Sequence, residues 1–189
     1  MTSNTPTPRV SPWAHPLDDF YARAGLPLPS IEPVAGDAVP EPYRSLLVHE
    51  RDMTPTLEQF HGDTIHIHAL SSELRGEVYL REVVLLLDRD ERPVEFGAIK
   101  ISLELFPPAA RRLIREEREP LGHILKSCDV AHTSRPKAFL RVASDAFINQ
   151  ALQLTGAHTL YGRRNTLADS QGRPLAEIVE ILPPVTQRK

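Results

Sequence analysis

The sequence contains a single cysteine, Cys128, so no disulfide bond can form within the chain. This fits a reducing compartment. Long apolar runs are absent too, because the longest, Val83 to Leu87, is far shorter than a membrane-spanning segment. The first residues, MTSNTPTPRVSPW, lack the charged and apolar regions of a signal peptide. These absences predict a cytoplasmic protein without a membrane partner.

An excess of positive charge is also missing. Lysine and arginine number 22 against 25 aspartate and glutamate residues, which gives a net charge of −3. We therefore expect no broad basic surface and no nucleic-acid partner. The hydrophobic fraction of 41% and the charged fraction of 25% are typical of a globular protein, and 189 residues suffice for one domain.

Proline is unevenly distributed, since half of the 18 prolines lie in the first 42 residues. We divide the chain into a proline-rich N-terminal extension, residues 1–42, and one domain, residues 43–189. Proline excludes regular helix and central strand from most of the extension. One short helix is expected at Leu17–Ala24, and the apolar residues Trp13 and Phe20 indicate that part of the extension packs on the domain.

Within the domain, alternating apolar residues predict a strand over residues 64–70, two strands around a turn at 88–93, and a closing hairpin that turns at 169–172. Helices are predicted in PTLEQFH, with Thr54 as N-cap and Gly62 as the stop, and in FPPAARRLIREEREP and PLGHILKS. The longest helix is expected in SRPKAFLRVASDAFINQALQLTG. This order indicates an α+β domain, an antiparallel sheet with helices packed on one side.

The first candidate for chemistry is Arg81, in the strand VYLREVVLLL, which is apolar on both faces. A guanidinium in such a strand either reaches water at a strand end or is buried with an anion. That anion is a structural carboxylate or a ligand carboxylate, for which the planar fork of N–H donors is well suited.

The closing hairpin supplies further candidates. One arm carries Arg163 and Arg164, and the other carries Glu177 and Glu180 on opposite faces. If both faces are covered, one of the two carboxylates lies among apolar neighbours. An edge strand with one solvated face is the alternative.

Four motifs in order resemble the chorismate lyase (chorismate pyruvate-lyase) family, over about residues 46–183. They are LLVHERDMTPTLEQF, VYLREVVLL with its arginine, EPLGHIL, and YGRRNTL followed by GRPLAEIVEILP. The resemblance implies a six-stranded antiparallel sheet with helices on one side and a ligand buried beneath two helical flaps.

The resemblance also implies roles for particular residues. Arg81 would bind the carboxylate of the aromatic product, and the backbone N–H groups of Met53 and Leu121 would contact the ligand. Glu180 would orient the ring hydroxyl and act as the base, with Glu177 as the fallback carboxylate. A second substrate carboxylate would be bound by Arg163 or Arg164, for which a surface pair beside Asp169 is the alternative.

By this resemblance the chain is a carbon–oxygen lyase that eliminates pyruvate from chorismate to give 4-hydroxybenzoate. Aromatisation of the ring drives the reaction, so no metal or redox cofactor is expected. Desolvation, orientation and charge stabilisation would supply the catalysis. The expected partner is a small aryl or cyclohexadienyl acid, and the expected oligomeric state is a monomer.

Two alternatives remain open. The same fold occurs in ligand-sensing domains of bacterial transcription regulators, so a non-catalytic protein that binds an aryl acid or another small effector would also need Arg81. The other alternative is a metal site. His66, His68 and Glu73 resemble part of a cupin motif, although the flanking glycines of that motif are missing.

Overall fold

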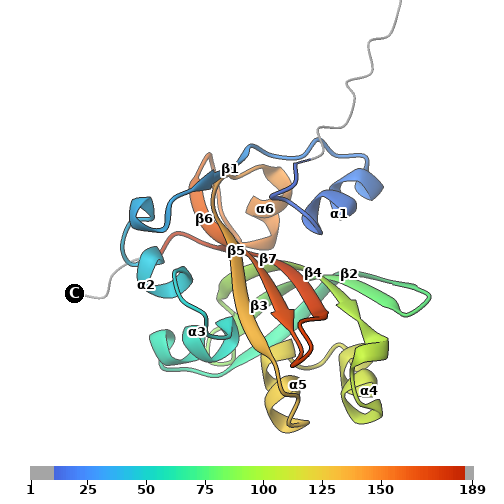
Figure 1. Ribbon diagram of the computed structural model, residues 1–189. Coiled ribbons are helices and arrows are strands. Elements are labelled where there is room, and N and C mark those ends of the chain that lie inside the picture. Colours follow the sequence, from blue (N-terminus) through green and yellow to red (C-terminus); the bar gives the residue numbers. More distant parts are fainter. Residues whose placement is uncertain (1–10, 186–189) are drawn as a thin grey trace, which may run out of the picture.

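The computed structural model describes residues 11–185, so residues 1–10 of the proposed extension and residues 186–189 lie outside the described part. Seven strands form one antiparallel sheet in the order β1-β5-β6-β7-β4-β3-β2 (Figure 1). Their bounds are β1 Ile31–Val34, β2 Ile65–Arg75, β3 Val78–Leu87, β4 Pro93–Ser102, β5 Thr133–Ala143, β6 Thr159–Ala168 and β7 Pro174–Leu182. The α+β class with an antiparallel sheet is therefore confirmed, with one strand more than the six expected.

Six α-helices accompany the sheet in the described residues (Figure 1). They are α1 Leu17–Ala24, α2 Tyr43–Leu47, α3 Met53–His61, α4 Pro108–Glu116, α5 Leu121–Ser127 and α6 Ala146–Ala151. Helices α2 to α5 bury their apolar side chains against one face of the sheet. The short helices α1 and α6 cover the other face, where Leu17, Phe20 and Ile148 join the core.

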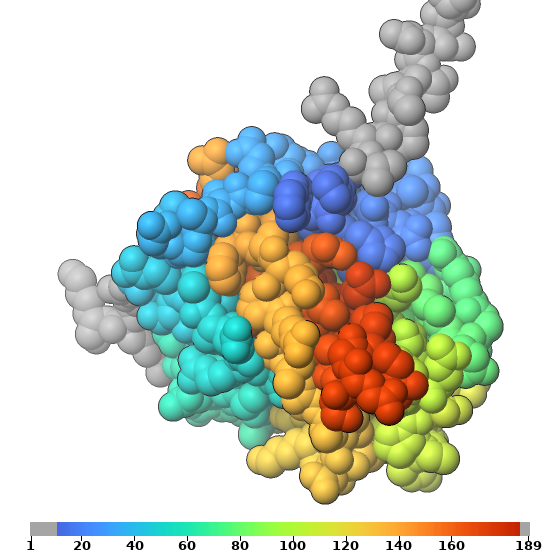
Figure 2. Space-filling model, in the orientation of Figure 1, coloured from blue at the N-terminus to red at the C-terminus, as the bar shows by residue number. Residues whose placement is uncertain are grey.

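The additional strand comes from the N-terminal extension. Residues Ile31–Val34 pair with Val142–Phe139 of β5, and Pro33 is tolerated because β1 lies at the sheet edge. The predicted helix Leu17–Ala24 is present as α1, which contributes buried Phe20 and Tyr21 to the core. Figure 2 shows these blue N-terminal segments packed directly against the rest of the molecule.

The longest predicted helix is wrong. Its sequence forms strand β5 and then the short helix α6, separated by Ser144 and Asp145. Leu140 and Val142 alternate with exposed residues, as in a strand, and the apolar spacing beyond them mimics a helix because α6 follows so closely. The break is marked by the carboxylate of Asp145, which accepts a hydrogen bond from the N–H of Ile148 at 2.8 Å as a helix N-cap.

The other predicted elements are present, with a shift at the start of α3. This helix begins two residues earlier than expected, so its N-cap is Asp52 and not Thr54. Gly62 ends it in the left-handed conformation, as the sequence indicates. Strand β2 continues to Arg75, beyond the predicted end at residue 70. Among the described residues, no helix is both long and apolar enough to span a membrane.

A close approach of two strands gives the first testable prediction. A Cβ atom on Gly162 of β6 would lie 2.2 Å from the backbone oxygen of Glu180 in β7. We expect Gly162→Ala to lower the free energy of unfolding by about 3 kcal/mol or more, because backbone atoms of a central strand cannot move aside as a side chain can. Urea unfolding followed by circular dichroism would measure the loss.

The matched control is Gly97→Ala in strand β4, which pairs with the other side of β7. Its nearest non-bonded atom would be the Glu95 carboxylate oxygen at 3.3 Å, the end of a flexible side chain. A smaller loss is therefore expected. Equal stability of Gly162→Ala and the wild-type protein would contradict the close packing of β6 on β7.

Candidate functional site

A cavity lies between the sheet and the first turns of α3 and α5. Its volume is about 60 Å³, room for several water molecules at ~10–15 Å³ each. Most of the lining is apolar. The side chains that bring polar atoms to it are Asp52, Thr54, Arg81, Glu95, Asn165 and Glu180.

The strand register explains why these residues meet. Arg81 in β3 lies opposite Ile99 in β4, which lies opposite Ile178 in β7, which in turn lies opposite Asn165 in β6. The next row on the same face runs from Val83 through Gly97 and Glu180 to Arg163. Because successive side chains of a strand alternate between faces, both rows face the cavity and the helices above it.

Arg81 is buried without a charged partner. Its residue is 1% exposed, its Nε donates to no acceptor, and one terminal nitrogen donates a long hydrogen bond of 3.4 Å to the backbone oxygen of Ile114. Within residues 11–185 it forms no ion pair with a carboxylate. Burial lowers the pKa of the Arg81 guanidinium, and the electrostatic effect of the nearby Tyr79 and Glu117 side chains opposes that shift.

Arg163, by contrast, has all its partners within the protein. It is fully buried and forms an ion pair with Glu180. Its terminal nitrogens donate to the backbone oxygens of His49 and Arg51, each at 3.1 Å. Arg163 therefore joins the sheet to the segment before α3, and its guanidinium is not free for a ligand.

A buried carboxylate, Glu95, was missed by the sequence analysis. It is 4% exposed, lines the cavity and leaves Oε2 without a partner. Burial raises the pKa of Glu95 well above its usual value, the nearby Glu180 adds to the rise, and Arg163 opposes it. The available signal was a charged residue within the otherwise apolar stretch Pro93–Ile99, the same kind of signal that identified Arg81.

Two helix starts form the opposite wall of the cavity. Met53 and Thr54 begin α3, and Leu121 and Gly122 begin α5. A Cβ on Gly122 would lie 3.0 Å from the Thr54 hydroxyl oxygen, so glycine lets the two helices approach closely. Met53, Arg81, Leu121 and Glu180, proposed from separate motifs, thus line one cavity.

Arg164 and Glu177 lie elsewhere, and their placement in the site is corrected. Both side chains are on the opposite face of the sheet, where a terminal nitrogen of Arg164 donates to Glu177 at 3.1 Å. Glu177 also pairs with Lys100 at 3.2 Å, and Arg164 donates to the backbone oxygen of His15 at 3.3 Å. Arg164 lies opposite Val179, the residue before Glu180, and successive side chains of a strand point to opposite faces. Arg164 and Glu177 therefore lie on the face opposite to that of Glu180.

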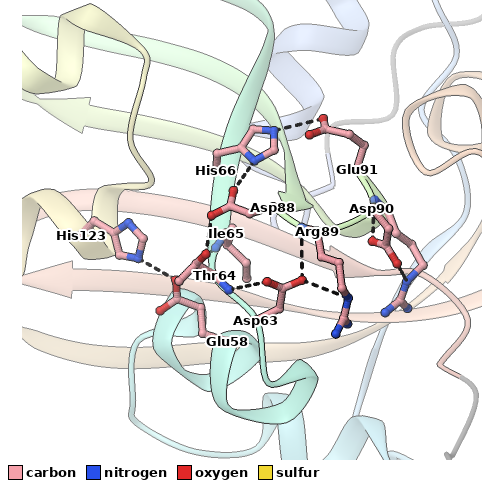
Figure 3. A network of polar contacts seen from close by, with 11 residues as sticks. Glu58, Asp63, Thr64, Ile65, His66, Asp88, Arg89, Asp90, Glu91 and His123 are labelled. Atoms are coloured by element: carbon pink, nitrogen blue, oxygen red, sulfur yellow. Dashed lines mark hydrogen bonds and ion pairs between the residues drawn. The ribbon is translucent and has the colours of Figure 1, made fainter.

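The metal alternative finds no support in the geometry. His66 is bonded through Nδ1 to Asp88 at 2.6 Å and through Nε2 to Glu91 at 3.2 Å (Figure 3). Glu73 pairs with Arg23 and Arg75 instead. Over residues 11–185, no group of three or more histidine, cysteine, aspartate or glutamate side chains is placed to hold a metal ion, so the alternative of a metal site at His66, His68 and Glu73 is not supported.

No protein-family model and no curated protein matches the sequence, but solved structures share its fold. The ligand-binding domain assigned to a GntR-family transcriptional regulator from Bordetella bronchiseptica has a TM-score of 0.50 at 16% identity, over 66% of this chain and 90% of that chain. PhnF from Mycobacterium smegmatis has a TM-score of 0.56 at 13% identity, over 75% of this chain and 71% of that chain.

The effector domain of the same PhnF has a TM-score of 0.53 at 13% identity, over 72% of this chain and 95% of that chain. Identities this low establish the shared fold alone, and the chorismate lyase-like α+β fold is thereby confirmed. Neither a family model nor a curated protein identifies the chain as a chorismate lyase.

The prediction of a carbon–oxygen lyase is wrong. The structures that share the fold are described as a regulator's ligand-binding domain and an effector domain, not as enzymes. The site agrees with this correction, because the carboxylate of Glu180, the expected base, is paired with Arg163. The expectation of no nucleic-acid partner is not supported either, since transcriptional regulators are among the neighbours.

The buried Glu95 predicts a specific dependence of stability on pH. Its pKa is raised in the folded state, so its contribution to stability is fully present below the unfolded pKa of about 4.3 and is lost as the pH rises above it. The side chain of Glu95→Gln cannot ionise, so the variant does not lose this stability as the pH rises. The variant should match the wild-type protein near pH 4.5 and exceed its unfolding free energy by about 1–3 kcal/mol at pH 8.

Urea unfolding of both proteins across this pH range is the measurement. Glu104→Gln is the control, because Glu104 is exposed and its replacement should change stability by less than ~0.5 kcal/mol at any pH. A constant difference between Glu95→Gln and the wild-type protein over the range would refute the buried, protonated carboxyl group.

Proposed function

We propose that the chain is a non-catalytic binding protein for a small organic anion, and that Arg81 binds the anionic group in the cavity. The observation that carries this proposal is the unpaired, buried guanidinium of Arg81. Burial of an ion costs several kcal/mol, and an isolated buried charge is retained where a partner arrives to compensate it. A ligand carboxylate accepts two parallel N–H bonds from such a fork.

The rest of the cavity lining suits a ligand whose main part is flat and apolar. Val83, Ile99, Ile178 and Leu125 surround the cavity, and Gly97 lies in the middle of its floor without a side chain. Binding pockets commonly combine such apolar walls with a few polar groups that orient the ligand. An aryl carboxylate, for which 4-hydroxybenzoate is a suitable probe, has both parts.

A ligand of this size requires the cavity to widen. At about 60 Å³ it now holds only water-sized molecules. The helices α3 and α5 form its roof, and each contributes only a few apolar side chains to the core below. Separation of these two helices is the simplest route, since the opposite wall is the hydrogen-bonded sheet.

The first test is direct binding. Isothermal titration of the protein with 4-hydroxybenzoate should give a saturable signal, and Arg81→Met should weaken the affinity by about 10- to 100-fold, because hydrogen bonds to charged groups contribute ~1.5–3 kcal/mol each. Arg112→Met is the matched control, since Arg112 is an exposed arginine on α4. Equal affinity of Arg81→Met and the wild-type protein, or no binding of any aryl acid, would contradict the proposal.

The same substitution should stabilise the ligand-free protein. Methionine fills a similar volume without a charge, so Arg81→Met removes an unpaired buried ion and should raise the free energy of unfolding by ~1–4 kcal/mol. Urea unfolding without ligand measures the gain. A loss of several kcal/mol would mean that Arg81 already has a partner within the fold, and that a ligand anion is not needed.

A further inference from the structure

Asp52 occupies the N-cap position of α3 but does not cap the helix. Its backbone angles, φ −67° and ψ 144°, are those of an N-cap residue, yet its side chain accepts no hydrogen bond from the helix backbone. Aspartate is among the residues most favoured at this position because its carboxylate binds the free N–H groups of the first turn. The carboxylate must therefore be held elsewhere.

His132 holds it. The Nε2 atom of His132 lies 2.9 Å and 3.1 Å from the two carboxylate oxygens of Asp52. The other ring nitrogen of His132 lies 2.8 Å from the backbone oxygen of Val130, so the ring is fixed from both sides. His132 itself is outside the cavity, beside a surface depression that it shares with Asp52 and Ser134.

The consequence is a helix start with unused donors that face the cavity. Pro55, the third residue of α3, has no N–H group, so the free donors of the first turn are those of Met53 and Thr54. Within the described residues, neither has an acceptor. Both residues line the same cavity as Arg81, whose Nε is unpartnered and whose residue is 1% exposed.

We propose that His132 is a positioning residue for the anion site, which holds Asp52 away from α3 so that the N–H groups of Met53 and Thr54 stay open to the ligand's anionic group. The inference rests on the proposed function, since it assigns the anion of that ligand to Arg81 and the α3 start together. Positive partial charge at a helix start and a cationic side chain favour the same anion.

Without His132, Asp52 becomes a competitor of the ligand. Its backbone is already set for capping, so rotation of the side chain alone would bring the carboxylate to the Thr54 N–H. A negative charge would then occupy the place of the ligand anion. The carboxylate of Asp52 is thus an anion of the protein itself, and His132 keeps it out of the site.

The test is a double-mutant cycle with 4-hydroxybenzoate as the probe, measured by isothermal titration on the full chain. His132→Ala should weaken binding about tenfold. Asp52→Ala in the same chain should restore the affinity to within about threefold of the wild-type value, because the competing carboxylate is gone. His132→Gln, whose amide can still donate to Asp52, should bind much as the wild-type protein does, as should the distant control His158→Ala.

A purely structural role of His132 predicts the opposite, since the second substitution would then weaken binding further. If wild-type binding depends on Arg81 but the double variant stays as weak as His132→Ala, this inference is overturned and the proposed function stands.

A measurement without ligand separates the two proposals. Amide hydrogen exchange at Thr54 should slow about tenfold in His132→Ala, because Asp52 then caps that N–H, and should not slow in the double variant. If no aryl acid binds but this slowing occurs, the proposed function fails, and only the conclusion that His132 holds Asp52 away from the Thr54 N–H stands. Unchanged exchange at Thr54 would overturn the role of His132.

Discussion

The fully buried contact of Arg163 with Glu180 determines where the roof of the cavity lies. Arg163 comes from β6, Glu180 from β7, and the remaining N–H groups of the guanidinium bind backbone oxygens of the segment between α2 and α3. That segment ends at Asp52, where α3 begins. One satisfied guanidinium therefore fixes an irregular segment onto the sheet and places the first turn of α3 over the cavity. Removal of one partner would leave the other charge buried and unpaired, which costs ~3–5 kcal/mol.

The two buried arginines differ in what they require. Arg163 has a carboxylate and several carbonyl oxygens, whereas Arg81 has a single long contact to Ile114 and an unpartnered Nε. They lie in adjacent rows of the same sheet face, on β3 and β6, with strands β4 and β7 between them. Arg163 thus stabilises the fold, whereas Arg81 keeps N–H donors that are free to bind a ligand. Burial alone does not distinguish these two roles.

Much of this arrangement could be predicted from the sequence, because period-two alternation identifies strand faces. It placed Arg81 among apolar residues and separated Glu180 from Glu177, and the motifs brought Met53 and Leu121 to the same cavity. Strand β5 was mistaken for helix because Phe139, Leu140 and Ala143 have helical spacing, although in the strand Phe139 and Leu140 pack on opposite faces of the sheet. The partner of Asp52 could not be predicted, since His132 is 80 residues away in the chain and becomes its neighbour only when α5 packs on α3.

The balance of charge around the cavity decides which ligands fit it. Arg163 is neutralised by Glu180, and Asp52 is paired with His132. Burial favours the protonated, neutral form of Glu95, which leaves Arg81 as the cation of the lining that has no carboxylate partner. A monoanion balances that charge. Chorismate carries two carboxylates and would need a second free cation, but Arg163 is used within the site and Arg164 pairs with Glu177 on the other face. Electrostatics therefore argues against chorismate as the ligand and supports the proposed monoanionic acid.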